Sequence, residues 1–188
     1  MKTAIILHGM PSKTGYYDPD RESQSNEHWL PWLQHELIIR DVLTQTPELP
    51  KPYDPTYEEW LDVFRRFQVD EDSVLVGHSL GGGFLVRWLS ESDVRINKLI
   101  LVAPWIDPDG KIKNGFFNFK IDGQLEEKVN ELHILHSKDD DKGVRESVKT
   151  LRNTIKDHKY HEFEKHGHFC FGDMKTREFP ELLKLILD

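Results

Sequence analysis

The chain has 188 residues, of which 37% are hydrophobic and 31% are charged, and its formal net charge at pH 7 is -8. This length predicts a single domain over residues 1–188 with a sizeable core. The acidic balance, without a basic block, argues against a nucleic-acid or anionic-membrane partner. The single cysteine, Cys170, excludes an internal disulfide and a cysteine-based zinc site. No segment is long and apolar enough for a signal peptide or a membrane span, so we expect a cytoplasmic protein.

The first third of the chain alternates segments typical of strands with segments typical of helices. Residues 4–7 are all apolar and predict a buried strand, followed by a polar loop that extends to about Asn26. A helix is predicted next, with Pro31 in its first turn and an apolar face formed by Trp29, Leu33 and Leu37. Residues 42–46 predict another strand, and Pro47 places it near an edge of the sheet.

A second helix is predicted after a connection that contains three prolines. Thr56 and Glu59 have the spacing of a capping box, in which the two side chains cap the first turn reciprocally. The apolar residues behind this start repeat at i, i+3, i+4 and i+7, and they are Trp60, Val63, Phe64 and Phe67.

The segment 73–83 combines a strand, a sharp turn and the start of a helix around one serine. Residues 74–76 are apolar, and residues 77–81 are Gly-His-Ser-Leu-Gly, which matches the pattern G-x-S-x-G. Such a turn leaves no room for side chains two positions before and two after the serine. It lifts the Ser79 hydroxyl to the edge of the sheet, at the positive end of the next helix, where an oxyanion is stabilised. The pattern predicts a nucleophile elbow, and a serine that only caps a helix is the alternative.

The second half of the chain continues the alternation of strands and helices. Apolar runs predict strands at residues 98–102, 132–136 and 160–163, whereas residues 106–123 are irregular. A helix between the last two strands is predicted by Val144, Val148, Leu151 and Ile155. The closing helix begins near Pro180 and presents Phe179, Leu182, Leu183, Ile186 and Leu187.

Strands that are apolar on both faces and alternate with helices are typical of a parallel sheet covered on both sides. The predicted fold class is therefore α/β, a doubly wound and mostly parallel sheet of about six strands with helices on both faces. Ligands of such sheets bind beyond the carboxyl ends of the strands. Ser79 follows one such end, and polar segments follow the strands at 132–136 and 160–163.

A serine nucleophile needs a base oriented by an acid, and in α/β-hydrolases the acid and then the histidine follow the serine. His168 is the predicted base because its flanking glycine and aromatic residue suit a tight loop, whereas His166 is expected at the surface or behind the site. The acid is one of Asp139, Asp140 and Asp141. Distance from the preceding strand favours Asp140, and spacing to the next helix suits Asp141. The two carboxylates not used are expected to be solvated, helix-capping charges.

The oxyanion hole is predicted to use backbone N–H groups, those of Leu80 in the elbow and Met10 in the loop after the first strand. His8 is expected to shape that loop rather than to take part in the chemistry. Three aromatic residues are candidates for lining an acyl or leaving-group pocket, with ordinary packing as the alternative: Trp105, Tyr16 and Tyr17.

Five motifs together resemble one known family. They are Asn26–Leu33 (Asn-Glu-His-Trp-Leu-Pro-Trp-Leu), Leu49–Pro52 with Trp60 downstream, Gly77–Gly81, Ser137–Asp140 and Gly167–Phe169. In this order and spacing, the chain is similar over nearly its whole length to the retinoblastoma-binding-protein-9-like (YdeN-like) serine hydrolases, a small lidless branch of the α/β-hydrolases. The resemblance implies serine-hydrolase activity with a Ser79–Asp140–His168 triad. The segment 141–145 is one residue longer than the family pattern and lacks its proline, which leaves open which aspartate faces His168.

The predicted function is a serine hydrolase, without metal or cofactor, that cleaves a small carboxylic ester, with amide and thioester bonds as further candidates. Ser79 attacks the carbonyl, His168 transfers the proton and Asp140 orients the imidazole. The mouth is expected to be covered at most by residues 106–123. A small-molecule ester or amide is the expected partner, and a protein partner is left open. Two alternatives share these residues: a binding or scaffold protein with this fold, and another triad chemistry such as C–C bond hydrolysis or haloperoxidase activity.

Overall fold

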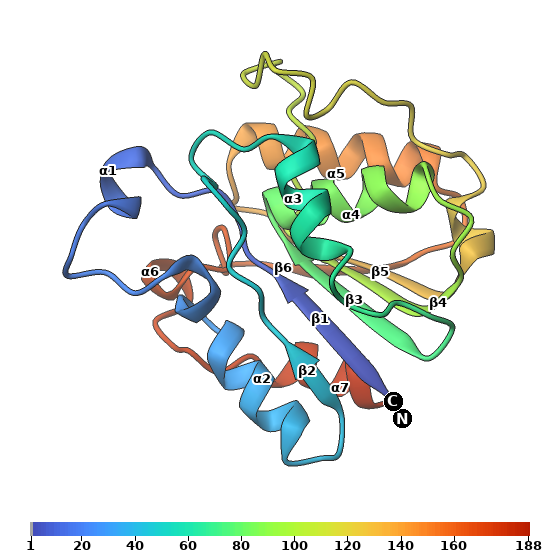
Figure 1. The fold of residues 1–188 in the computed structure, drawn as a ribbon, viewed down its shortest axis with the longest axis horizontal. Helices are drawn as coiled ribbons and strands as arrows, with labels where there is room; N and C mark the ends of the chain where they lie inside the picture. The colour runs from blue at the N-terminus through green and yellow to red at the C-terminus, as the bar shows by residue number, and fades with distance from the viewer. Residues whose placement is uncertain (1) are drawn as a thin grey trace.

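Six parallel strands form one sheet at the centre of the molecule, which a computed structural model describes for residues 2–188 (Figure 1). Their order is β2-β1-β3-β4-β5-β6, and every neighbouring pair is parallel. The predicted doubly wound sheet is therefore confirmed. The strands are β1 (Thr3–Leu7), β2 (Leu43–Gln45), β3 (Ser73–His78), β4 (Ile96–Val102), β5 (Val129–Ser137) and β6 (Lys159–Phe163).

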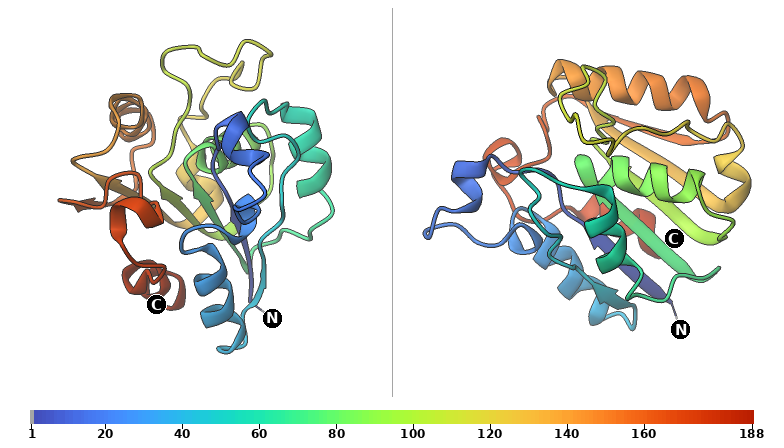
Figure 2. Two further views of the ribbon diagram at one scale, coloured as in Figure 1. Left: turned by 90° about the vertical axis from the view of Figure 1, so that its left-hand side faces the viewer. Right: turned by 45° about the horizontal axis from the view of Figure 1, so that its top comes forward.

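Helices cover both faces of this sheet, in two layers that are clearest when the molecule is turned (Figure 2). One face carries α2 (Leu30–Ile38) and α7 (Pro180–Leu187), which contact each other. The opposite face carries α3 (Tyr57–Phe64), α4 (Leu80–Ser90) and α5 (Lys142–Thr154). Because the sheet is covered on both sides, almost every residue of its central strands β3 and β4 is buried.

Four short helical segments within residues 2–188 were not predicted. They are α1 (Lys13–Tyr16), the 3-10 helices η1 (Gln24–Asn26) and η2 (Leu125–Lys128), and α6 (Phe171–Met174). Two of them, α1 and η1, lie in the region predicted as a polar loop. Each segment has only three or four residues, which is too short for a hydrophobic period to show in the sequence.

The capping box predicted for α3 is wrong in its hydrogen bonds. The helix begins after Thr56 as expected, but the Thr56 hydroxyl donates to the Glu59 carboxylate at 2.8 Å and does not cap the helix backbone. The Lys51 ammonium also donates to Glu59, at 2.8 Å. In a capping box, the Glu59 carboxylate would instead accept a hydrogen bond from the Thr56 N–H. Here the carboxylate is bound by Lys51 and by the Thr56 hydroxyl.

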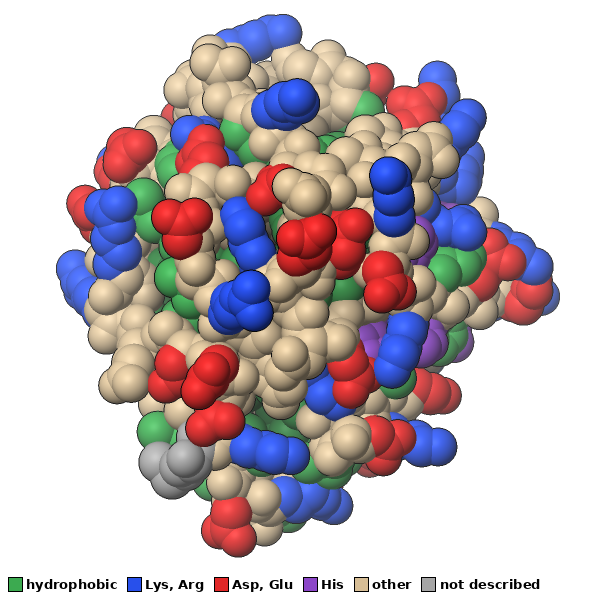
Figure 3. All heavy atoms as spheres, turned by 90° about the vertical axis from the view of Figure 1, so that its right-hand side faces the viewer, with side chains coloured by type: hydrophobic (Ala, Val, Ile, Leu, Met, Phe, Trp, Pro, Cys, Tyr) green, Lys and Arg blue, Asp and Glu red, His purple; other side chains and the backbone are tan. Residues whose placement is uncertain are grey.

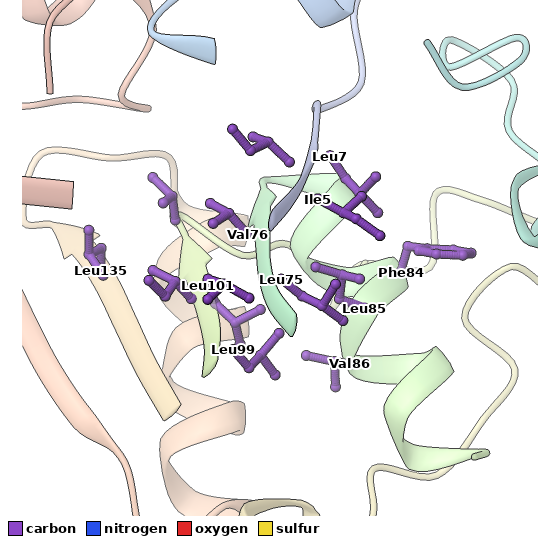
Figure 4. Close-up of a cluster of buried hydrophobic side chains, with 14 of the residues drawn as sticks. Ile5, Leu7, Leu75, Val76, Phe84, Leu85, Val86, Leu99, Leu101 and Leu135 are labelled. Atoms are coloured by element: carbon purple, nitrogen blue, oxygen red, sulfur yellow. The ribbon is translucent and has the colours of Figure 1, made fainter. Parts of the chain in front are cut away.

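The core lies between the central strands and α4, where side chains of β1, β3 and β4 meet those of the helix (Figure 4). Phe84 of α4 also contacts the ring of Trp60 from α3, with 5.7 Å between ring centroids. The two helices are thereby held together over the sheet. Fully buried members of this cluster include Leu7, Leu75, Phe84, Leu85 and Leu101.

The turn between β3 and α4 packs backbone directly against backbone. A Cβ placed on Gly77 would lie 2.6 Å from backbone atoms of Gly82, and one placed on Gly81 would lie 2.6 Å from the carbonyl oxygen of His8. These distances are shorter than Cβ contacts in proteins, so only glycine fits at either position. The crowding expected from G-x-S-x-G is confirmed.

The strand order places this turn at the point where the sheet changes its winding direction. β1 lies between β2 and β3, so the chain first extends the sheet to one side of β1 and then to the other. Loops that follow β1 and β3 diverge at such a point and leave a crevice beyond the strand ends. Residues 8–10 and Ser79 stand at this place.

The molecular surface mixes both signs of charge. On the face shown in Figure 3, Lys and Arg side chains alternate with Asp and Glu. Ion pairs account for part of this pattern, as where Lys98 and Lys159 approach Glu131 to 3.5 and 2.6 Å. None of the helices within residues 2–188 has the length and hydropathy needed to cross a bilayer.

We expect Gly77→Ala to lower the free energy of unfolding by about 3 kcal/mol, because the added methyl group overlaps backbone that cannot move without opening the turn. Urea denaturation measures this change. Gly123→Ala is the matched control, since a Cβ there meets no atom within 4 Å, and it should change stability by less than about 0.5 kcal/mol. Equal stability of the two variants would contradict the crowding at the turn.

Candidate active site

Ser79 occupies the turn in a strained backbone conformation. Its φ is 54° and its ψ is -117°, a combination that residues other than glycine rarely adopt. The end of β4 holds this conformation, because the Ser79 N–H donates to the Val102 carbonyl at 2.9 Å and the Trp105 N–H donates to the Ser79 carbonyl at 3.0 Å. The side chain is left at the wall of a cavity.

Two backbone N–H groups are predicted to form the oxyanion hole: that of Leu80, which directly follows Ser79, and that of Met10 in the loop after β1. Leu80 is the first residue of α4, so its N–H has no acceptor within the helix. Met10 lines the same cavity as Ser79. Neither N–H donates to a backbone carbonyl within residues 2–188. Both N–H groups therefore lack a backbone acceptor in the described residues, and the oxyanion hole stays a prediction.

His8 shapes the Met10 loop, as expected. Its Nδ1–H donates to the Gly9 carbonyl at 2.8 Å, and its Nε2 accepts from the Leu49 N–H at 2.9 Å. Because Nε2 is an acceptor, the ring is neutral. Burial lowers the pKa of His8 and so favours this neutral form.

His168 is held in a loop between two residues with positive φ, Gly167 at 49° and Phe169 at 57°. The His168 N–H donates to the Asp173 carboxylate at 3.0 Å. From the other side, His78 Nε2–H donates to the His168 carbonyl at 2.8 Å. A Cβ on Gly167 would lie 2.5 Å from Asp173 Cγ, which explains the glycine. The backbone of the loop is thus fixed on both sides of the imidazole.

The carboxylate of Asp140 faces the imidazole of His168. The distances from His168 Nδ1 to Asp140 Oδ1 and Oδ2 are 3.0 and 3.2 Å. The Asp140 side chain is fully buried, and the Asp141 N–H also donates to it, at 2.6 Å. An ionised carboxylate only accepts hydrogen bonds, so Nδ1 carries the proton and Nε2 is the basic nitrogen.

The other two aspartates have different surroundings. Asp139 accepts from the Ser137 hydroxyl at 2.5 Å and from the Gly167 N–H at 2.9 Å, and it ties the loop after β5 to the loop after β6. The hydrogen bond from Ser137 lowers the pKa of Asp139. Asp141 is the N-cap residue of α5, although its side chain makes no capping hydrogen bond. Both residues are exposed, as expected for solvated charges, but neither side chain caps a helix: Asp139 joins the two loops, and Asp141 occupies the N-cap position without a capping hydrogen bond.

Ser79 and His168 line one cavity of about 340 Å³ beyond the carboxyl ends of β1 and β3. Its other walls come from residues 8–11 and from parts of 21–28 and 170–172. On the 21–28 side the wall is polar, because it includes Arg21, Gln24, Glu27 and His28.

The segment 106–123, which was expected to be the most that could cover the mouth, contributes no lining residue to this cavity. The three candidate pocket aromatics are also absent from its lining. Trp105 packs against Phe117, with ring centroids 5.7 Å apart, and the Tyr17 hydroxyl hydrogen-bonds to that of Tyr53 at 2.7 Å. Trp105 is thus a buried packing residue, which was the alternative expectation, whereas Tyr17 is exposed.

Sequence reasoning did not assign a role to the residues that hold His168. These residues include His78, which directly precedes Ser79, and Asp173, which lies five positions after His168. Trp29, part of the family signature, donates from Nε1 to the Phe169 carbonyl at 3.1 Å. His166 lies behind the site, where its ring packs on Phe163 with 4.5 Å between centroids. His78 and Asp173 could have been identified by their proximity in the sequence to Ser79 and His168.

Cys170 also lines the cavity, but burial raises the pKa of its thiol to about 12. The thiol is therefore protonated at neutral pH and is a poor nucleophile. In the described part of the chain, no three His, Cys, Asp or Glu side chains are grouped as a metal ion would require.

Burial keeps the histidines around the site uncharged. It lowers the pKa of His78 well below its usual value. It also lowers the pKa of His28 to about 4, and repulsion from the Arg177 guanidinium, and from the His168 ring when that ring is protonated, adds to this effect. Folding therefore favours the neutral forms of these rings.

We expect the stability of the protein to fall as the pH is lowered from 7 toward 4. The pKa of His28 is about 4 in the folded state and near 6.5 in the unfolded chain, so unfolding between these values takes up a proton. Each such proton lowers the free energy of unfolding by about 1.4 kcal/mol per pH unit. Urea titrations at pH 7, 6 and 5 should show a shallower decline for His28→Asn than for the wild type.

The exposed His35 on α2 provides the matched control, as His35→Asn. A decline in stability that is as steep in His28→Asn as in the wild type would show that His28 is not held neutral by burial.

Comparison with known proteins agrees with this arrangement. A family model described as Serine hydrolase matches residues 15–186. YdeN of Bacillus subtilis (strain 168), which is named as a hydrolase, is 30% identical over 175 residues, covering 89% of this chain and 86% of the relative. The crystal structure of the ydeN gene product from B. subtilis has a TM-score of 0.83 and 27% identity, over 100% of this chain and 97% of that one.

Two esterases share the fold at low identity. Est1E from Butyrivibrio proteoclasticus, in a structure with ferulic acid, has a TM-score of 0.64 at 15% identity, over 99% of this chain and 86% of that one. An esterase from Exiguobacterium antarcticum has a TM-score of 0.68 at 14% identity, over 100% of this chain and 92% of that one. The elbow turn, the six-stranded sheet and the match over residues 15–186 lead to one conclusion: the chain belongs to the YdeN-like serine hydrolases, a family of the α/β-hydrolase fold.

Proposed function

We propose that the protein hydrolyses a small carboxylic ester through a Ser79–His168–Asp140 triad and an acyl-enzyme intermediate. The observation that carries this proposal is the placement of His168 between the buried Asp140 carboxylate and the cavity that Ser79 also lines. A neutral imidazole with its proton on Nδ1 presents a basic Nε2, which is what a serine nucleophile requires.

The proposed reaction has two stages. His168 Nε2 takes the Ser79 proton as the hydroxyl oxygen attacks the substrate carbonyl, and it then passes the proton to the leaving group. Water, deprotonated by the same nitrogen, releases the acyl group. The N–H groups of Leu80 and Met10 stabilise the tetrahedral oxyanion, and each such donor contributes about 10²–10³ in rate. The reaction uses no metal or cofactor.

The proposed substrate carries a short acyl chain. A cavity of about 340 Å³ with a polar wall favours small, polar groups over long alkyl chains. The esterases among the fold relatives support an ester over other carbonyl substrates. We propose a small-molecule ester as the partner, without nucleic acid or membrane, and a cytoplasmic location, which suits a chain with a single cysteine.

We expect Ser79→Ala to reduce the hydrolysis of p-nitrophenyl acetate by at least about 10³-fold, because it removes the nucleophile. It should also abolish covalent labelling by a fluorophosphonate probe. Cys170→Ala, which changes the other nucleophilic side chain in the cavity, should keep the labelling. A folded wild-type protein that the probe does not label would instead support a binding or scaffold role.

Replacing the three aspartates one at a time identifies the acid. Asp140→Asn should lower kcat/KM by about 10³–10⁴-fold, because the amide no longer holds the proton on His168 Nδ1. Asp141→Asn should stay within about threefold of the wild type, and Asp139→Asn within about tenfold, because these side chains do not hydrogen-bond to His168. Equal retention of activity by all three variants would contradict the assignment.

A further inference from the structure

A second, basic cavity lies on the other side of the loop that carries Asp140. It has a volume of about 300 Å³ and is formed between α5 and the strands β5 and β6. Three cationic side chains from successive turns of α5 line it, and no carboxylate does. They are Arg145, Lys149 and Arg152. In a protein with a net charge of -8, this local excess of positive charge favours an anion.

Two of these cations are held in place by neighbouring groups. The Arg145 guanidinium donates to the Asp140 carbonyl at 2.5 Å. The Arg152 guanidinium stacks over the ring of Tyr160, 3.6 Å from its centroid. On α5, Lys142 pairs with Glu146 at 3.5 Å, whereas Lys149 lines the cavity without an ion pair within residues 2–188.

The floor of the cavity contains a buried imidazole with an unused nitrogen. The Tyr160 hydroxyl donates a hydrogen bond to Glu162 at 2.9 Å. Because its proton is used there, its oxygen accepts the hydrogen bond from His136 Nδ1, also at 2.9 Å. Nδ1 of the neutral ring is therefore protonated, and Nε2 carries a lone pair. His136 is 7% exposed, and its buried Nε2 has no hydrogen-bond partner. An unpaired polar atom of this kind indicates a missing partner.

We propose that this cavity binds a small tetrahedral dianion, such as sulfate or a phosphate group, between Arg145, Lys149 and Arg152, and that the buried His136 beside them is then protonated on Nε2. The three cations supply charge-assisted hydrogen bonds, and the positive charge on the buried imidazole adds to the attraction. This site is separate from the hydrolase cavity, and the inference does not depend on the proposed function.

Binding should be linked to uptake of a proton. Burial lowers the pKa of His136, and the cations Arg145 and Arg152 act in the same direction, against Asp140 and Glu162, which raise it. His158 and Tyr160 also face the cavity. A bound dianion offsets the effect of the cations and raises the pKa of His136, so the proton is taken up on binding. Affinity for a dianion should therefore increase as the pH falls.

Sulfate is the suitable probe because its charge does not change between pH 6 and 8. We expect a two-dimensional NMR titration of the full chain with sodium sulfate, at constant ionic strength set by chloride, to perturb amides of α5 and β6. Lys149→Gln should weaken binding about threefold, and Lys149→Gln combined with Arg145→Gln about tenfold. Lys142→Gln removes the same charge from the same helix outside the cavity and is the matched control.

The affinity of the wild type should increase by about threefold or more from pH 8 to pH 6, and His136→Gln should lose this dependence. Equal weakening by Lys149→Gln and Lys142→Gln would overturn the proposal, because it would show unspecific attraction to the helix. A pH dependence that persists in His136→Gln would overturn it as well.

Discussion

The packing of backbone against backbone at the turn between β3 and α4 is the constraint on which the rest of the site depends. It leaves no space for side chains at Gly77 and Gly81, and it forces Ser79 into a positive φ. Hydrogen bonds to the end of β4 and the burial of α4 on the sheet hold this conformation. The strain at one residue is thus offset by a large apolar core, as is common at functional sites.

The same turn also positions the imidazole. His78 directly precedes Ser79 and donates to the His168 carbonyl, so the loop after β6 is held against the Ser79 turn as well as by its own strand. Asp173 and Trp29 hold this loop from other directions. Because these contacts join loops that follow different strands, the relative positions of serine, histidine and aspartate depend on the parallel order of the whole sheet.

The loop after β5 contacts lining residues of both the Ser79 cavity and the basic cavity. Through its carboxylate, Asp140 accepts a hydrogen bond from His168, and through its carbonyl it accepts one from Arg145. One residue therefore contacts a lining residue of the Ser79 cavity and a lining residue of the basic cavity. Buried histidines occur at both places, His78 near the serine and His136 near the arginines, and burial favours the neutral form of each.

Local sequence patterns were sufficient for the parallel α/β sheet, the crowded turn at Ser79 and the approximate positions of the long helices, because burial and steric crowding follow from residue type over a few positions. They could not choose between Asp140 and Asp141, which are adjacent and chemically identical. That choice is made by contacts that place His168, 28 residues further along, against one carboxylate. Likewise, only the tertiary structure shows that residues 21–28, and not 106–123, wall the cavity. Such contacts join segments that are far apart in the chain, so a local sequence pattern cannot predict them.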